Sequence, residues 1–99
     1  MIAFVRTAGI APGKTGAVMA FAKEIAAYFK THYDVELTVL TPIGGNPQRI
    51  AWSSRYKDLS AVQTLLNKMA ADKGYWELVN KNVDCFVPGS LNDAFWQEV

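Results

Sequence analysis

The chain has very little cysteine and histidine, two residue types from which many catalytic and metal centres are built. It contains one cysteine, Cys85, and one histidine, His32, in 99 residues. A single cysteine excludes an internal disulfide, and these two residues lie too far apart in the sequence to form a metal-binding motif. A serine triad would have to use His32, for which a structural role at a helix end is the favoured interpretation. We therefore expect no metal and no cofactor, and catalytic residues stay unknown.

An excess of charge and a long apolar run are also missing. Ten lysines and arginines oppose nine acids, which gives a net charge of +1, and the two signs are interspersed. A nucleic-acid-binding domain would show a basic stripe, so we expect no nucleic-acid partner. No apolar segment approaches membrane-spanning length, and the N-terminus does not resemble a signal peptide. We expect no membrane partner and a cytoplasmic location.

What the chain does have is a large apolar fraction in a regular order. Hydrophobic residues make up 51% of it, enough to bury one core, so we expect a single domain over residues 1–99. The patterns predict, in order, a strand at 2–7, a helix at 16–31, strands at 35–41 and 49–56, a helix at 60–80 and a strand at 83–87. This β-α-β-β-α-β order predicts an α+β fold with a four-stranded antiparallel sheet and two helices on one face.

Local signals refine the boundaries of these elements. Ser60 with Gln63 fits a capping box, and Gly74 is expected to interrupt the second helix. Residues 90–93 resemble the cap of a short final helix that carries Phe95 and Trp96. These two aromatic residues pack either on their own subunit or on a partner, and the sequence leaves both alternatives open. The apolar stripe of the first helix is expected to be Val18, Phe21, Ala22, Ile25 and Phe29. That of the second is expected to be Leu59, Val62, Leu65, Leu66 and Met69, with Trp76 as a further candidate.

Residues 8–15 come close to a phosphate-binding loop of the form G-x-x-x-x-G-K-[ST]. Ala8 replaces the first glycine, and Pro12 removes an amide that such a loop needs. The chain is also too short for the parallel sheet, covered on both sides, in which these loops occur. We interpret the segment as a turn into the first helix, with Thr15 near the helix start.

One face of the sheet is predicted to carry the functional residues. Since helices pack most closely over small side chains, we expect Ala3, Val5, Ala51 and Ser53 to lie beneath the helices. The larger side chains would then line the uncovered face, which is too apolar to remain in water. The candidate ligand-binding residues on that face are Phe4, Arg6, Trp52, Ser54 and Tyr56.

Arg6 and Trp52 allow two interpretations. In one, Arg6 faces a pocket and binds a carboxylate or another anion, and Trp52 provides a flat apolar wall. In the other, Arg6 pairs with a neighbouring acid and Trp52 only seals a subunit interface. The residues alone do not choose between them.

Residues 49–59, Arg-Ile-Ala-Trp-Ser-Ser-Arg-Tyr-Lys-Asp-Leu, followed by Trp76, resemble the NIPSNAP family. With the strand order, the whole chain resembles a dimeric α/β-barrel, or ferredoxin-like, domain. The resemblance implies a homodimer whose two sheets face each other and enclose a cavity. It also aligns Trp52 with the interior tryptophan of related monooxygenases, whereas His32 lies outside the region of a haem ligand.

Two functional hypotheses follow from this resemblance, since the fold alone does not select an activity. The first is a small homodimeric NIPSNAP-like domain that binds a small molecule in an apolar inter-sheet cavity, without an identifiable catalytic set. The alternative is a cofactor-independent monooxygenase or isomerase that acts on a small aromatic or acidic compound. There, Arg6 would hold an anionic oxygen and Ser54 or Tyr56 would supply a hydroxyl. Whether the chain is an enzyme stays open.

Overall fold

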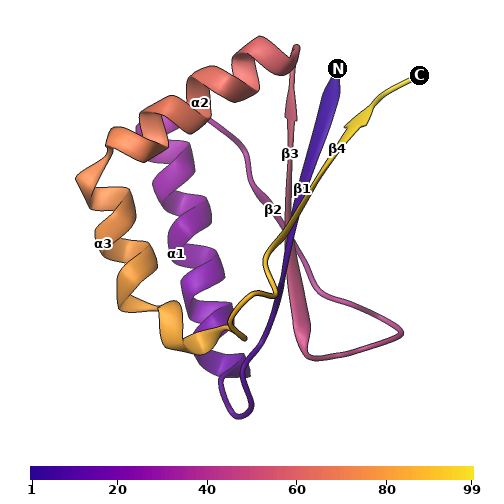
Figure 1. Cartoon of the computed structure of the whole chain (residues 1–99), viewed down its shortest axis with the longest axis vertical. Helices are drawn as coiled ribbons and strands as arrows, with labels where there is room; N and C mark the ends of the chain where they lie inside the picture. Colours follow the sequence, from indigo (N-terminus) through magenta and orange to yellow (C-terminus); the bar gives the residue numbers. More distant parts are fainter.

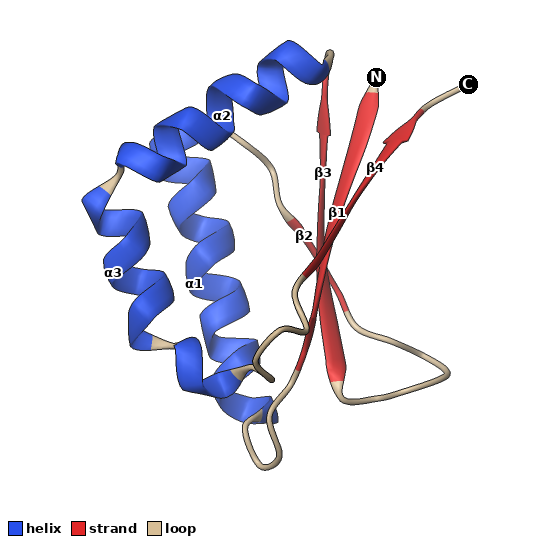
Figure 2. Cartoon of the chain, in the orientation of Figure 1, coloured by secondary structure: helices blue, strands red, loops and turns tan.

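The computed structural model describes residues 1–99 and shows a four-stranded sheet covered by helices on one side (Figure 1). All neighbouring strands are antiparallel, and their order across the sheet is β2-β3-β1-β4. The other face of the sheet carries no helix (Figure 2). The predicted α+β order is confirmed. The elements are β1 (Ile2–Gly9), α1 (Thr15–Tyr33), β2 (Thr38–Leu40), β3 (Arg49–Tyr56), α2 (Leu59–Ala71), α3 (Lys73–Lys81), a 3₁₀ turn η1 (Val83–Cys85) and β4 (Asn92–Gln97).

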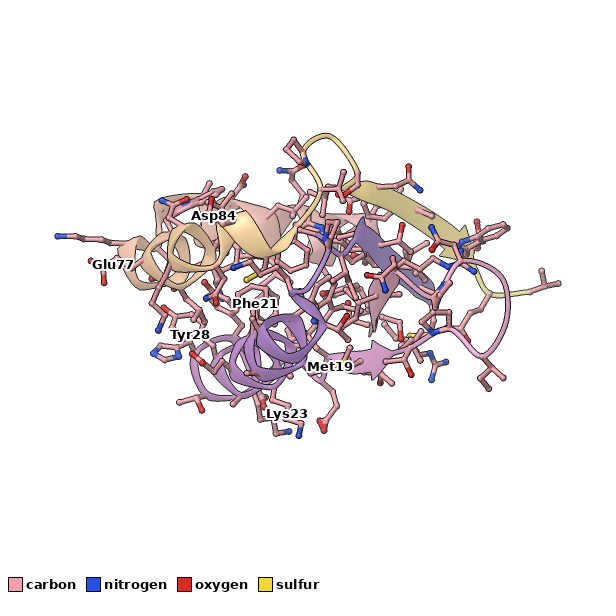
Figure 3. All side chains as sticks on the ribbon, turned by 90° about the horizontal axis from the view of Figure 1, so that it is seen from below. Met19, Phe21, Lys23, Tyr28, Glu77 and Asp84 are labelled. Carbon is pink, nitrogen blue, oxygen red and sulfur yellow. The ribbon has the colours of Figure 1, made fainter.

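The first helix, α1, buries the stripe that its sequence predicts. Phe21 turns toward the interior, whereas Lys23 points away from the rest of the molecule (Figure 3). No side chain caps the start of α1, which begins at Thr15. Strand β2 is shorter than the predicted range 35–41, because only Thr38–Leu40 pairs with β3. No helix of the chain has the length and apolar character needed to cross a membrane.

The second helical segment is two helices that meet at Asp72. This residue is extended, with φ −93° and ψ 104°, and its carboxylate accepts hydrogen bonds from the N–H groups of Gly74 and Tyr75. The predicted break at Gly74 is therefore wrong, because Asp72 caps α3 and Gly74 lies inside it. Leu59, expected on the apolar stripe, is 60% exposed. We refer to residues 59–81 as the α2–α3 arm.

The end of the chain differs most from the sequence prediction. Residues 83–87, predicted as the last strand, form the η1 turn and one bridge between Phe86 and Ile10. The last strand is β4, which pairs with β1 over its whole length, although this segment was predicted as a short helix. Ser90, which resembled a helix cap, instead donates its hydroxyl to the Val87 carbonyl and accepts the Gly9 N–H. It fixes the turn that starts β4.

The faces of the sheet are reversed relative to the prediction. Phe4 lies opposite Ser54, and Arg6 lies opposite Trp52, so these large side chains share one face. That face meets the helices, since Trp52 is 7% exposed and the Phe21 ring lies 6.2 Å from it. The small residues Ala3, Val5, Ala51 and Ser53 lie on the uncovered face. The prediction assumed close helix packing, whereas the arm stands away from the sheet and leaves room for large side chains.

The start of α2 supplies a test of the capping signals. Its cap is Asp58, whose carboxylate accepts a hydrogen bond of 2.9 Å from the Ala61 N–H, and the predicted cap Ser60 lies inside the first turn. We expect Asp58→Ala to lower the free energy of unfolding by about 1 kcal/mol. Ser60→Ala should change it by less than about 0.5 kcal/mol. Urea denaturation measures both, and equal losses would contradict the assignment.

Candidate functional site

A cavity of about 520 Å³ lies between the helix-facing side of the sheet and the helices. Its volume is typical of small-molecule sites. Twenty of its 25 lining residues are hydrophobic, so the cavity suits an apolar occupant. All five residues predicted from the sequence line it from β1 and β3. The other walls come mainly from α1 and the α2–α3 arm, through Phe21, Ile25, Phe29, Val62, Leu65, Leu66, Met69, Ala70, Tyr75, Trp76 and Val79.

The cavity lies within one chain, which corrects the location expected from the sequence. Phe4, Arg6, Trp52, Ser54 and Tyr56 were expected on the uncovered face, where a second copy would enclose them. They lie together, but beneath the helices of their own chain. Because successive side chains of a strand point to opposite faces, these residues stay together whichever face is covered.

Arg6, the one charged residue among those lining the cavity, is held by an ion pair. Its Nε lies 2.7 Å from Asp93 Oδ1, and its Nη2 lies 2.9 Å from Oδ2. The hydrogen bonds to Asp93 raise the pKa of Arg6. The bidentate pair uses two of the five N–H donors of the planar guanidinium. Of the two interpretations of Arg6, the structure shows the pairing with a neighbouring acid, which balances its charge.

Trp52 is the most unusual residue of the cavity wall. The Phe21 and Phe86 rings each lie 6.2 Å from its ring. Its Nε1–H is buried and has no hydrogen-bond partner, and it is the one buried side-chain nitrogen or oxygen in this condition. A buried donor without an acceptor typically costs about 1–3 kcal/mol, so such groups are rare in folded proteins. Trp52 therefore carries an unused donor in an apolar wall.

Hydroxyl groups supply the remaining polar atoms near the sheet. Ser54 is 4% exposed, and its hydroxyl donates to Tyr56 Oη over 2.9 Å. This leaves the Tyr56 O–H free to donate. Burial raises the pKa of Tyr56, and it also raises the pKa of Tyr75 on α3. Both phenols are thus kept neutral. The lining includes no Asp, Glu, His or Lys.

The mouth of the cavity is bordered by exposed apolar residues. Trp76 on α3, Val83 in η1, and Val87 and Leu91 in the following loop all line the cavity and are exposed. None of them was predicted as a site residue. The apolar run 83–87 is visible in the sequence, but it was interpreted as a strand and thus as core.

The fold is shared with solved structures of NIPSNAP domain proteins. One from Burkholderia xenovorans is 19% identical, with a TM-score of 0.84, over 100% of this chain and 95% of that chain. A NIPSNAP family protein of unknown function from Agrobacterium tumefaciens is 17% identical, with a TM-score of 0.85, over 100% of this chain and 88% of that chain. An antibiotic biosynthesis monooxygenase is 12% identical, with a TM-score of 0.73, over 100% of this chain and 99% of that chain.

At these identities the likeness establishes the fold, which is the ferredoxin-like fold expected from the resemblance. No protein-family model matches the chain, and no curated protein matches it. The functional argument therefore rests on the cavity itself.

The neutral phenols give a measurable prediction. Burial raises the pKa of Tyr28, Tyr33, Tyr56 and Tyr75 above the usual 10.0. At pH 10 we expect tyrosinate absorbance well below half of its maximum in the folded protein and about half in denaturant. Because the folded pKa is the higher one, the associated stability is present below pH 10 and is lost above it. Equal absorbance in both states would contradict the burial of these hydroxyls.

Proposed function

We propose that the chain binds a small, neutral, largely aromatic molecule in the cavity between its sheet and its helices. The observation that carries this proposal is the buried Nε1–H of Trp52, which lacks an acceptor in an apolar wall. Neighbouring atoms cover Nε1, so a ligand with a carbonyl or a similar oxygen would satisfy this donor by displacing the side chains that cover it. Its apolar part would contact the aromatic rings that line the cavity.

The charge distribution supports a neutral ligand over an acidic one. Arg6 is already neutralised by Asp93, and the lining contains no other cation. An anion would lose its hydration without gaining an opposite charge, which is costly in an apolar cavity. The free polar atoms of Trp52 and Tyr56 are donors, so they suit an uncharged acceptor. Of the aromatic and acidic compounds considered from the sequence, the aromatic class fits better.

Binding is also better supported than acid–base catalysis. A general base needs a group that accepts a proton near neutral pH. The lining offers no carboxylate or imidazole, and burial moves the pKa of Tyr56 away from neutrality. The monooxygenase alternative has the support of the fold likeness alone. We therefore treat it as a separate outcome of the binding experiment.

A pair of matched compounds tests the proposal. 2-Acetylnaphthalene carries a carbonyl acceptor, and 2-ethylnaphthalene has nearly the same shape without one. We expect the first to bind about fivefold more tightly, the value of one ordinary hydrogen bond. Its binding should move the indole N–H proton resonance of Trp52 downfield in the spectrum of the ¹⁵N-labelled protein. Trp52→Phe should remove both the resonance and the preference.

Trp96→Phe is the matched control, since Trp96 is 65% exposed and does not line the cavity. It should leave the preference for the acetyl compound unchanged. Equal affinity of the two compounds for the unmodified protein, or no binding of either, would contradict the proposal. Oxygen uptake with 1-naphthol that depends on Trp52 would instead support the monooxygenase alternative.

We further propose that the uncovered face of the sheet, here called the open face, pairs with a second copy of the chain. It carries an exposed tryptophan and leucine among small side chains, with Arg49 and Arg55 at the two ends of β3, and apolar patches rimmed by polar residues often mark interaction sites. A two-fold axis would let the same surface cover itself. Phe95 and Trp96 divide between the two sides: the Phe95 ring packs 4.8 Å from Phe4, and Trp96 lies on the open face. The registers place Ala3, Val5, Thr7, Gly9, Thr38, Leu40, Arg49, Ala51, Ser53, Arg55, Asn92, Ala94 and Trp96 on this face.

A charge at the centre of the open face tests this pairing. Val5 lies between Ser53 and Ala94 in the sheet. We expect Val5→Lys to convert a dimer into a monomer, because two buried ammonium groups would face each other across the axis. Light scattering after size exclusion measures the mass. Leu59→Lys, at an exposed position of α2, is the control and should remain dimeric. A monomeric unmodified protein would exclude the pairing.

A further inference from the structure

The carboxylate of Asp72 collects four hydrogen bonds at the bend of the α2–α3 arm. Its Oδ2 accepts from Tyr33 Oη at 2.6 Å and from Tyr28 Oη at 2.8 Å. Its Oδ1 accepts from the N–H groups of Gly74 at 3.0 Å and Tyr75 at 3.3 Å. Figure 3 shows Tyr28 between α1 and α3. The residue thus caps α3 and ties the bend of the arm to α1, and we call this cluster the Asp72 pin.

Elsewhere the arm is attached at its ends and through buried apolar side chains, among them Met69 and Tyr75, whose ring lies 6.1 Å from that of Phe29 on α1. Its backbone approaches the rest of the fold most closely at β3, which precedes α2, and at η1, which follows α3. Between these ends, eight side chains of the arm, all of them apolar or aromatic, line the cavity. The other polar tie to α1 is an exposed pair between Glu24 and Lys81 at 3.9 Å, and such pairs contribute little. The Asp72 pin is therefore the main polar attachment of the middle of the arm.

Gly74 is part of the same arrangement. A Cβ at this position would lie 2.6 Å from Tyr28 Oη and 3.4 Å from Asp72 Oδ1. Any other residue would displace the Tyr28 hydroxyl from the pin. The glycine, which looked like a helix break in the sequence, is needed here for this close approach.

We propose that Asp72 is a positioning residue of the ligand cavity, and that the α2–α3 arm swings about it to admit the ligand. This inference rests on the proposed function. Both helices of the arm line the cavity, and Trp76 of α3 borders its mouth. A single extended residue separates the two helices, so a small change at Asp72 moves α3 as a unit.

A polar pin suits a transient opening. Its hydrogen bonds exchange for hydrogen bonds to water when it releases, so the cost of release is only part of their gross energy. Parting an equally large apolar contact would expose surface to water and would cost more. The bonds from Tyr33 and Tyr28 also hold the pKa of the Asp72 carboxyl below its usual range. The group stays ionised near neutral pH, and the pin closes again after each opening.

The double substitution of Tyr28→Phe with Tyr33→Phe tests the inference, because it removes two hydroxyls and keeps both rings. Without ligand, we expect amide hydrogen exchange in α3 and the end of α2 to rise about tenfold, while exchange in β1 and β3 stays unchanged. With 2-acetylnaphthalene, the association and dissociation rate constants should both rise about fivefold, and Kd should change by less than about twofold. Stopped-flow fluorescence measures these rates.

Gly74→Ala should reproduce the result through the clash with Tyr28, and Glu24→Gln is the control that should leave both measurements unchanged. Equal acceleration of exchange in the arm and in the sheet would overturn the inference, since the pin would then only support overall stability. Unchanged rate constants in the double variant would also overturn it. If the unmodified protein binds no naphthalene, the proposed function fails, and hydrogen exchange still decides whether Asp72 is a hinge.

Discussion

The packing of the large side chains of β1 and β3 against the helices is the contact on which the rest of the structure depends. In a strand, a shift of one residue would send every side chain to the opposite face. Here the register is held by the Arg6–Asp93 pair and the Phe4–Phe95 contact, which join β1 to β4 on the helix-facing side. Because Trp52 lies beneath the helices, the side chains that share its face line the cavity and supply its hydrogen-bond donors. The alternate side chains of the same strands then form the open face.

The order of the elements could be predicted from the sequence because it depends on local periodicity. Alternation along β1 and β3 and the three- and four-residue spacing in α1 are properties of the segments themselves. The choice of the covered face is different, because alternation defines two faces without saying which one meets the helices. The rule that small residues lie under helices failed at Ala3 and Ala51, since the arm does not approach the sheet closely.

Long-range hydrogen bonds explain the other differences. Asp72 ends α2 because it caps α3 and accepts from two tyrosines that lie 39 and 44 residues away in the sequence. Ser90 bonds Gly9, 81 residues away, and this fixes the turn before β4. No local pattern contains these partners, so Gly74 was taken for the break and residues 90–93 for a helix cap. The five candidate site residues were found together because sharing a strand face is local, whereas the opposite wall of the cavity is not.

The sheet separates the two surfaces to which we assign binding. Along β1, Arg6 faces the cavity and its neighbour Val5 faces the open side; along β3, Trp52 and Ser53 divide in the same way. The central strands β1 and β3 are hydrogen-bonded on both sides, so they form the rigid wall of the cavity. The arm, attached at its ends and at Asp72, forms the wall that can move. A partner on the open face would therefore leave the entry of a ligand free, since it covers the side of the sheet away from the arm.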